Sequence, residues 1–450
     1  MHHQTETLMK RFLYLMMFAS CLCGRAQKEW SVERCIAYAV EHNHDVRLRD
    51  MAVTDYRIEK TRQATSFLPS ISASMGANVN FGRAIDPVTN TYTDVSTFSN
   101  GYGISAGIPI FDGLQRYNGL RIAKANLLMG RQGVLAQKDA TARAVLEAYT
   151  QVLYYKGTVE IARQKLAESD MLLHQTVVMA EIGTKGEADV AQMQATYASD
   201  DCELTRQQGL LDNSVLELKR QMNFPIDSTL EVVSVLADDI LCERPTEQRC
   251  EDIFMQAKLF DPELKMAEYS LKTARYSLHQ SKCFFLPSIS VSTGISTSYN
   301  KVIGSSNTMA FGDQFRNNAG EYVSASFSLP IFSRLNGILN IRRQRNNVRR
   351  AEEELRYRND ELYRLIRQAL TDVDNSRKEA EKMHLKVEAD SLASRLVIRK
   401  YEEGLASPID VQTQAYALLQ SRAQLLQSRL NYAYKTRIVN YYKGTPLWTE

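Results

Sequence analysis

Two carboxylates stand at matching positions of the chain and are the residues best placed to act on a passing ion. Asp189 follows Gly183 by six residues, and Asp410 follows Gly404 by the same interval, 221 residues later. Each acid falls in the predicted first turn of a helix, where the helix dipole stabilises a negative charge, so a capping role is the simplest hypothesis. Repeated around a symmetry axis, the same acids would form a ring, which favours cations and can take part in gating.

Each acid belongs to a predicted helix-turn-helix tip, over about residues 182–189 and 403–410. Glycine is common just after a helix ends, because it adopts the left-handed conformation without strain. Ser407 and Pro408 suit the N-cap and the first position of the following helix. The two turns also contain Gly183, Thr184, Lys185, Gly404, Leu405 and Ser407.

Enzyme chemistry finds little support in the sequence. The chain contains no His-Glu-x-x-His motif and no phosphate-binding glycine loop. Its seven histidines are scattered, and its seven cysteines form no metal-binding spacing. The formal net charge is +3, with Lys and Arg spread along the chain rather than gathered in a stripe. We therefore predict a protein that is not an enzyme and has no catalytic residue, cofactor, metal site or nucleic-acid partner.

The first residues are typical of an export signal. Lys10-Arg11 precede an apolar run from Phe12 to Phe18, and the small residues of Gly24-Arg25-Ala26 follow. A charged start, a short apolar run and a small-residue cleavage site together indicate a signal peptide rather than a membrane span. We predict a signal over residues 1–26, and translation could start at Met1 or Met9.

Three cysteines leave alternatives open. Phe18-Ala19-Ser20-Cys21 loosely resembles a lipoprotein box, so lipidation of Cys21 competes with simple cleavage after Ala26. Cys242 and Cys250 could form a disulfide within a linker, since disulfides persist in oxidising compartments. Unpaired thiols explain the same residues equally well.

The chain contains a long internal repeat. Ile-Pro-Ile-Phe at 108–111 returns as Leu-Pro-Ile-Phe at 329–332, and Phe-Leu-Pro-Ser-Ile-Ser at 67–72 returns at 285–290. Such units often cannot bury their apolar faces alone, so the repeat must be recognised before the fold is predicted. The division that follows is residues 27–225 for the first repeat, 226–247 for a linker and 248–450 for the second repeat.

Each repeat carries two predicted strands with strict alternation of apolar and polar residues. The strands are expected at about 69–82, 100–111, 287–299 and 321–332. Alternation indicates one apolar and one wet face, and here the wet face is almost all Ser, Gly and Asn. Strands of about 10 residues cross a bilayer at a tilt, and a closed membrane barrel needs about 8 or more of them. Two chains (8 strands) or three chains (12 strands) would therefore have to combine, and the strand pattern alone does not choose.

The remaining sequence predicts very long helices. Proline is absent between Pro109 and Pro225 and between Pro330 and Pro408. Each interval is expected to hold one helix of ~70 residues, ~105 Å long, then a break and a helix of ~35 residues. A further continuous helix of ~35 residues is expected before each strand pair. Apolar and small residues follow a 4-3 spacing typical of a coiled coil, at 148, 152, 155, 159, 162 and 166 and again 221 residues later.

The order and spacing of these motifs resemble the TolC-type outer-membrane efflux protein family over nearly all of the chain from Trp30 to Leu447. The resemblance implies a mainly α fold with a small β-barrel contribution: a homotrimer with a 12-stranded barrel, four strands from each chain, in the outer membrane. A helical coiled-coil barrel would cross the periplasm, belted by residues 225–249 and the chain's end. The tips would meet a periplasmic adaptor (membrane fusion) protein, which links to an inner-membrane pump of the RND or ABC type. The adaptor-contact residues that the resemblance implies are Gly183, Thr184, Lys185, Gly404, Leu405 and Ser407.

The implied function is a passive exit duct for drugs and other small toxic compounds. Type I protein secretion and metal efflux are alternatives, and a non-channel coiled-coil protein of the envelope is the alternative of another class. Asp189 and Asp410 match the family's acidic rings. The sequence departs from the family pattern at Thr413, where a second acid often stands, and at Ala406, the counterpart of Lys185.

Overall fold

The computed structural model describes residues 30–85, 90–94, 96–233, 249–304 and 309–448. Within these ranges helices dominate, and the strands form one four-stranded sheet and one two-stranded ribbon. The fold class expected from the sequence, mainly α with four strands per chain, is confirmed. The expected signal peptide, Cys21 and Cys242 lie outside the described residues, and the linker is described only as far as Val233.

The helices and strands follow the order of the repeat. They are α2 (Val32–His42), α3 (His44–Thr65), β1 (Ser70–Asn80), β2 (Arg83–Ile85), β3 (Tyr92–Asp94), β4 (Thr97–Phe111), α4 (Gln115–Glu181), α5 (Glu187–Met222), α6 (Cys250–Phe260), α7 (Pro262–Lys282), η2 (Cys283–Phe285), β5 (Ser288–Val302), α8 (Phe311–Asn317), β6 (Gly320–Ser328), α9 (Asn336–Glu402) and α10 (Pro408–Tyr442).

The chain divides into two compact units. Unit 1 holds Met1–Leu48, Leu135–Phe260 and Glu361–Glu450, and unit 2 holds Arg49–Val134 and Asp261–Asp360. The long helices α4 and α9 supply residues to both units. None of the described helices combines the length and the apolar composition that a membrane span requires.

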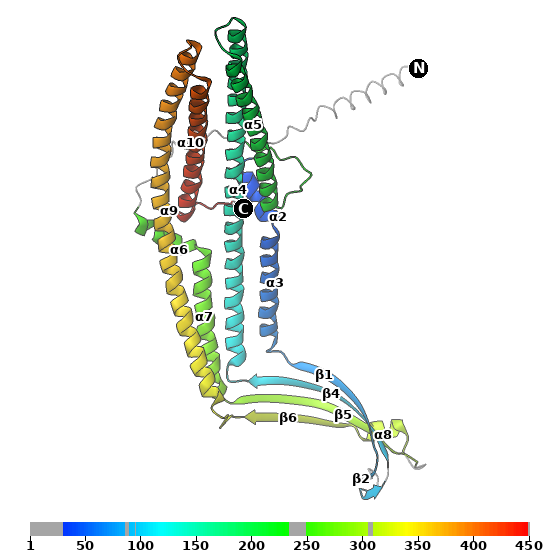
Figure 1. Cartoon of the computed structure of the whole chain (residues 1–450). Helices are drawn as coiled ribbons and strands as arrows, with labels where there is room; N and C mark the ends of the chain where they lie inside the picture. Colours follow the sequence, from blue (N-terminus) through cyan, green and yellow to red (C-terminus); the bar gives the residue numbers. More distant parts are fainter. Residues whose placement is uncertain (1–29, 86–89, 95, 234–248, 305–308, 449–450) are drawn as a thin grey trace, which may run out of the picture. The chain divides into compact units, whose positions relative to one another are not determined.

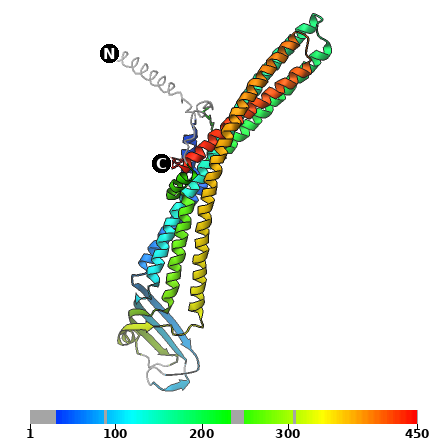
Figure 2. The same cartoon turned by 90° about the vertical axis from the view of Figure 1, so that its left-hand side faces the viewer.

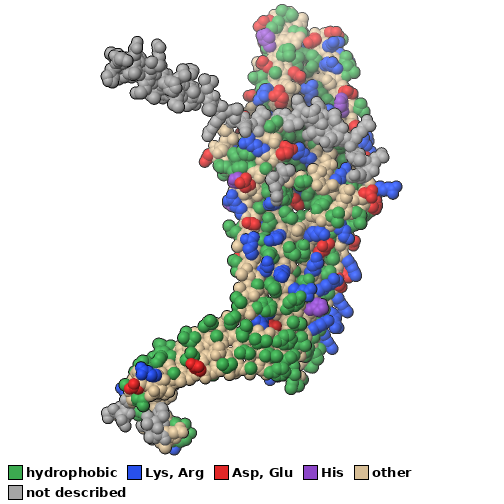
Figure 3. Space-filling model, turned by 180° about the vertical axis from the view of Figure 1, so that it is seen from behind, with side chains coloured by type: hydrophobic (Ala, Val, Ile, Leu, Met, Phe, Trp, Pro, Cys, Tyr) green, Lys and Arg blue, Asp and Glu red, His purple; other side chains and the backbone are tan. Residues whose placement is uncertain are grey.

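Unit 2 carries the four-stranded sheet, in the order β1-β4-β5-β6 with antiparallel neighbours (Figure 1). Directly opposite residues of antiparallel strands point to the same side, so the register gathers apolar side chains on one face. Exposed members of this apolar face are Ile71, Met75, Ile104, Ile295, Val323 and Phe327. Seen from behind, hydrophobic side chains also gather where the strands meet the helices (Figure 3).

The opposite face of the sheet is lined by small polar residues. The hydroxyls of Ser72 and Ser105 lie 3.1 Å apart across β1 and β4, and those of Ser290 and Ser326 lie 2.6 Å apart across β5 and β6. β6 ends at Ser328, short of the expected position 332, whereas β4 continues past the matching Pro109 to Phe111 with a shift in register. The sheet thus has one apolar and one hydroxyl-rich face, as the alternation predicts.

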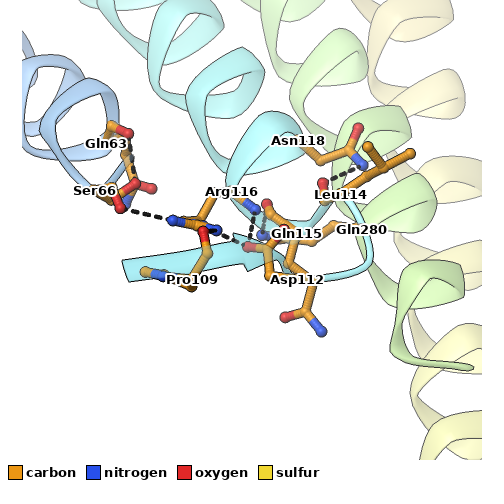
Figure 4. Close-up of polar contacts among 9 residues, drawn as sticks. All are labelled: Gln63, Ser66, Pro109, Asp112, Leu114, Gln115, Arg116, Asn118 and Gln280. Carbon is orange, nitrogen blue, oxygen red and sulfur yellow. Dashed lines mark hydrogen bonds and ion pairs between the residues drawn. The ribbon is translucent and has the colours of Figure 1, made fainter. Parts of the chain in front are cut away.

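Arg116 stabilises the connection between β4 and α4 by hydrogen bonds (Figure 4). Its guanidinium donates to the Asp112 carboxylate at 2.9 Å, to the Ser66 carbonyl at 2.8 Å and to the Pro109 carbonyl at 2.6 Å. The side chain is only 15% exposed, so these charge-assisted bonds form largely away from water. The second repeat has Gly337 at the matching position, which has no side chain to form these hydrogen bonds.

Unit 1 contains two helical hairpins, formed by α5 and α10 with the parts of α4 and α9 that follow Val134 and Asp360, and their turns lie at the same end of the unit (Figure 2). The helices have 67, 36, 67 and 35 residues, close to the expected lengths. Most of the predicted 4-3 positions are buried, namely Ala148, Val152, Val159, Ala162, Val373, Ser376 and Ala380. The small residues along this seam let neighbouring helices approach closely.

Two helices that were expected to be continuous are each broken, so that expectation was wrong. At Asn43 the backbone turns extended, and its side-chain amide donates to the Gln221 carbonyl at 3.3 Å, ending α2. At Asp261 the carboxylate accepts from the Leu264 amide at 2.8 Å and starts α7, with Pro262 at its first position. Local capping by Asn and Asp-Pro therefore outweighs the surrounding helix propensity.

The core of unit 1 joins parts of the chain that are distant in sequence. The Trp30 amide donates to the Glu231 carbonyl at 2.8 Å, and Val232 is buried beside it. At the chain's end, the buried Asp139 carboxylate accepts from the Tyr441 hydroxyl at 2.6 Å and the Trp448 indole at 2.8 Å. The first contact binds the start of the described chain to the segment after α5, and the others bind its end to α4.

Candidate functional site

The tip between α9 and α10 is built by reciprocal capping. Gly404 has φ +77° and turns the chain out of α9, and the Leu405 amide donates to the Lys400 carbonyl at 2.7 Å. Ser407 accepts from the Asp410 amide at 3.3 Å, while the Asp410 carboxylate accepts from the Ser407 amide at 2.9 Å and its hydroxyl at 2.7 Å. This is a complete capping box, in which the backbone amides of both residues find a side-chain acceptor at the start of the helix.

These contacts have an electrostatic consequence for Asp410. The hydrogen bond from the Ser407 backbone amide, followed by the bond from its hydroxyl, lowers the pKa of the Asp410 carboxyl. The carboxylate is exposed and keeps its charge over a wider acid range than an isolated aspartate. The expected negative charge is therefore present at this tip, although its nearest partners belong to its own helix.

The tip between α4 and α5 has the same backbone with fewer side-chain contacts. Gly183 has φ +79°, and the Thr184 hydroxyl donates to the Met179 carbonyl at 2.8 Å. The Asp189 carboxylate accepts from the Gly186 amide at 3.2 Å, but glycine has no side chain to return the bond. Only half of a capping box is therefore formed here.

Tyr401 joins the two tips. The side chain is fully buried, and its hydroxyl lies 2.8 Å from the Thr176 hydroxyl of α4. Met193 of α5 and Val411 of α10 complete the buried cluster around the ring. Burial is the largest cause that raises the pKa of Tyr401, so the phenol remains a neutral hydrogen-bonding group. The two hairpins of one chain are thus locked together next to the candidate acids.

Lys185 contributes to the same contact from the first tip. Its ammonium lies 4.0 Å from the centroid of the Tyr401 ring, which is cation–π geometry. The charge of Asp189 also reaches Tyr401 and adds to the rise of its pKa. The basic residue of the first tip therefore holds the second hairpin, whereas Leu405 at the second tip is 74% exposed.

Deeper in the hairpins a buried ion pair forms between α4 and α5. Lys165 and Asp200 are in direct contact, and their side chains are only 12% and 6% exposed. The Lys165 ammonium also lies 5.6 Å from the centroid of the Tyr416 ring of α10. Nearer the tips, the Gln192 amide donates to Gln412 at 3.4 Å, so polar contacts between the hairpins continue along their length.

Sequence reasoning located the turns and the acids but missed Tyr401 and Thr176. The repeat offset of 221 contains one usable signal, since Ala180 stands where the second repeat has Tyr401. The two repeats share the turn that follows, but only the second has a large aromatic residue before it. This difference indicates a contact that only one tip makes. The identity of its partner, 225 positions away, has no signal in the spacing.

One serine also has the sequence context of a nucleophile. Residues Gly103–Gly107 contain Gly-Ile-Ser-Ala-Gly, the spacing of a hydrolase nucleophile elbow. Ser105 instead lies inside β4, directly opposite Ser72 of β1. An elbow requires a sharp turn between a strand and a helix, so this serine is part of the hydroxyl-rich face of the sheet.

Comparison with known proteins agrees with this geometry. The chain matches the sequence model of the outer membrane efflux protein family over residues 36–223 and 254–437. It is 22% identical to the toluene efflux pump outer membrane protein TtgF of Pseudomonas putida over 401 residues, 88% of this chain and 79% of that protein. It is 21% identical to the alkaline protease secretion protein AprF of Pseudomonas aeruginosa over 374 residues, 81% and 75% of the two chains.

Among solved structures, the outer membrane protein VceC of Vibrio cholerae has the same fold. The TM-score is 0.76 at 13% identity, covering 92% of this chain and 96% of that chain. The shared fold consists of duplicated helical hairpins and a four-stranded sheet with one apolar face. This chain belongs to the outer membrane efflux protein family, so the resemblance and the outer-membrane location expected from sequence are confirmed.

Proposed function

We propose that three copies of this chain form the outer-membrane channel of a tripartite export system. The observation that carries the proposal is the sheet of unit 2, which has an exposed apolar face, a hydroxyl-rich face and only four strands. β1 and β6 each have an unpaired edge within the sheet, and open edges are not tolerated in lipid. Pairing these edges between three chains would close a barrel of about 12 strands with the serines inside.

The helical hairpins of unit 1 supply the periplasmic part of the duct. We place the gate at their tips, with Asp189 and Asp410 as its acids and Tyr401 as the buried contact that holds the hairpins of each chain together. The carboxylates would repeat around the trimer axis and favour cations at the entrance. Opening requires the hairpins to separate, so the Tyr401 contact opposes opening.

A periplasmic adaptor and an inner-membrane pump complete the export system. The residues we assign to adaptor contact are those at the two turns: Gly183, Thr184, Lys185, Gly404, Leu405 and Ser407. Leu405 supports this assignment, because it is 74% exposed at the apex of a turn. Lys185 gives the assignment weaker support, because its ammonium already contacts the Tyr401 ring of the same chain.

The cargo that we propose is small molecules, delivered by the adaptor and the pump. Similarity to a toluene efflux pump protein over 88% of this chain supports this class of cargo. Similarity to a protease secretion protein, over 81% of this chain, favours type I protein secretion as the second candidate. Deleting the gene and measuring both solvent tolerance and secreted protein would separate the two, since only one of them should fall.

The gate assignment is tested by conductance of the full-length protein in planar bilayers. Replacing Asp410 with Ala removes the exposed carboxylate and its bonds to Ser407, so we expect higher conductance and weaker block by divalent cations. Asp201→Ala, which removes an exposed acid from the body of α5, is the matched control and should change neither. Unchanged conductance and cation block in Asp410→Ala would remove the gate assignment while leaving the channel itself in place.

A further inference from the structure

Helix α8 lies beside one end of the four-stranded sheet (Figure 1). β6 begins at Gly320, which pairs with Ser296, whereas β5 continues to Val302 alongside β4. The last six residues of β5 therefore have a strand on one side only. An unpaired edge of this kind exposes backbone donors and acceptors, which is costly in or near lipid.

Side-chain amides of the α8 segment take the place of the missing strand. Gln314 accepts from the Asn300 amide at 3.0 Å and donates to the Asn300 carbonyl at 2.9 Å. Asn318 donates to the Ser298 carbonyl at 2.7 Å. Three backbone groups of the β5 edge are thus satisfied by two side chains, which pins the helix against the sheet.

The helix lies on the apolar face of the sheet. The Thr297 hydroxyl donates to the Phe315 carbonyl at 2.6 Å, and Thr297 is directly opposite Tyr102 of β4. The Phe315 ring lies 5.4 Å from the Tyr102 ring, and the Phe311 ring lies 5.3 Å from the Tyr299 ring. Tyr102 shares its face with Ile104, since alternate residues of a strand point to the same side.

Large apolar side chains of the segment remain exposed after this packing. Met309, Phe311 and Phe315 are 55%, 48% and 42% exposed, and Arg316 is exposed beside them. Beyond Ile295 the same face of β5 carries Thr297, Tyr299 and Lys301, so the two phenylalanines add apolar surface where the strand itself is mixed. Aromatic residues with a neighbouring cation are typical of the boundary between acyl chains and headgroups.

We propose that α8 is an interfacial helix that lies against lipid of the outer leaflet, outside the barrel wall. Met309, Phe311 and Phe315 contact the outer ends of the apolar layer, and Arg316 lies at the level of the lipid phosphates. The inference rests on the proposed function, because the apolar face of the sheet must meet lipid. Gln314 is the positioning residue, since it holds the helix on the strand edge without needing to contact lipid.

The test is fluorescence quenching in vesicles of phosphatidylcholine brominated near the carbonyl end of its acyl chains. A tryptophan replaces Phe315 in the full chain, and the parent chain, with Trp30 and Trp448, gives the constant background. Val323→Trp on the apolar face of β6 is the positive control, and Tyr322→Trp on the hydroxyl-rich face is the negative control. We expect added quenching and a blue-shifted emission for Phe315→Trp, and none for Tyr322→Trp.

Two outcomes overturn the inference, and they are distinguishable. If Val323→Trp is quenched but Phe315→Trp is not, the helix does not meet lipid, while the channel assignment survives. If neither is quenched, the apolar sheet face does not meet lipid, and the proposed channel fails together with the inference.

A second variant tests how the helix is held. Adding Gln314→Ala to Phe315→Trp should reduce the quenching, because the helix loses both bonds to Asn300. Asp313→Ala, an exposed change in the same helix, should leave the quenching intact. Equal quenching in the Gln314→Ala and Asp313→Ala backgrounds would show that the amide does not position the helix.

Discussion

The two tips of unit 1 have one backbone and different side chains. Gly183 and Gly404, 221 residues apart, have φ of +79° and +77°. In both tips an aspartate three residues into the next helix accepts from the N-cap amide, at 3.2 Å for Asp189 and 2.9 Å for Asp410. The repeat has therefore preserved the turn and the placement of the acid.

The side chains around the turn have diverged in a complementary way. The second tip has Ser407 as its cap and Tyr401 before its glycine, where the first has Gly186 and Ala180. The first tip has Lys185, where the second has Ala406 in the cluster around Tyr401. One tip supplies the ring and the other supplies its partners, so duplication produced a contact that two identical tips could not form.

The largest effect is expected at the shared contact. Tyr401→Ala removes a fully buried aromatic side chain, which costs about 3–5 kcal/mol in a core that cannot collapse. The rate of amide hydrogen exchange should then rise in the first turns of both α5 and α10. Tyr401→Phe is the matched control and should cost only about 1 kcal/mol, since the Thr176 hydroxyl still donates to Leu172. Loosening confined to α10 would contradict a contact shared by the two tips.

Alanine substitution should destabilise the two tips equally at Gly183 and Gly404, because the two glycines have the same backbone conformation. A Cβ at Gly183 or Gly404 meets no atom within 4 Å, so the cost of alanine comes from the left-handed backbone alone. We expect each alanine variant to lose about 1–2 kcal/mol, measured as local opening by hydrogen exchange at its own tip. Asparagine, which tolerates this conformation, should cost less at both positions. A clear inequality between the two alanine variants would break the comparison.

Substitutions at the two N-cap residues, Ser407 and Gly186, should change local stability by unequal amounts. Ser407→Ala removes a side chain that bonds the Asp410 amide, and loss of such a cap costs about 1 kcal/mol. Gly186→Ser supplies the missing half of the box at the first tip and should stabilise it by a few tenths of a kcal/mol, roughly the usual difference between these caps. Amide protection in the first turns of α10 and α5 measures both changes, and destabilisation by Gly186→Ser would contradict the comparison.

The smallest effect is a dependence on pH at the second tip. The Asp410 carboxyl has a folded pKa below its unfolded value, so its stabilisation is present above the unfolded pKa. This stabilisation is lost as the pH falls through the lowered folded pKa, when the carboxylate is protonated. Amide protection factors in α10 should therefore decline below the usual aspartate range. Asp410→Asn does not titrate and should remove that decline.

Much of the fold could be predicted because its signals are periodic and local. Alternation at period two identified the strands, the absence of proline identified the long helices, and the repeat placed both tips. The breaks at Asn43 and Asp261 were missed because single capping residues are weak signals within a strong helical pattern. Helix α8 was not foreseen, since it lies between two of the expected strands, where no helix was predicted.

The sequence by itself determined most of the elements and the charge at each tip, because these depend on residues a few positions apart, and it determined the duplication because motifs recur along the chain. Only the tertiary structure decided which residues touch: Tyr401 with Thr176 of the other repeat, and Gln314 with the edge of β5 in its own repeat. Such contacts depend on how whole helices and strands pack against one another. Burial and hydrogen bonding select them only after the elements have formed, and they leave no regular spacing in the chain.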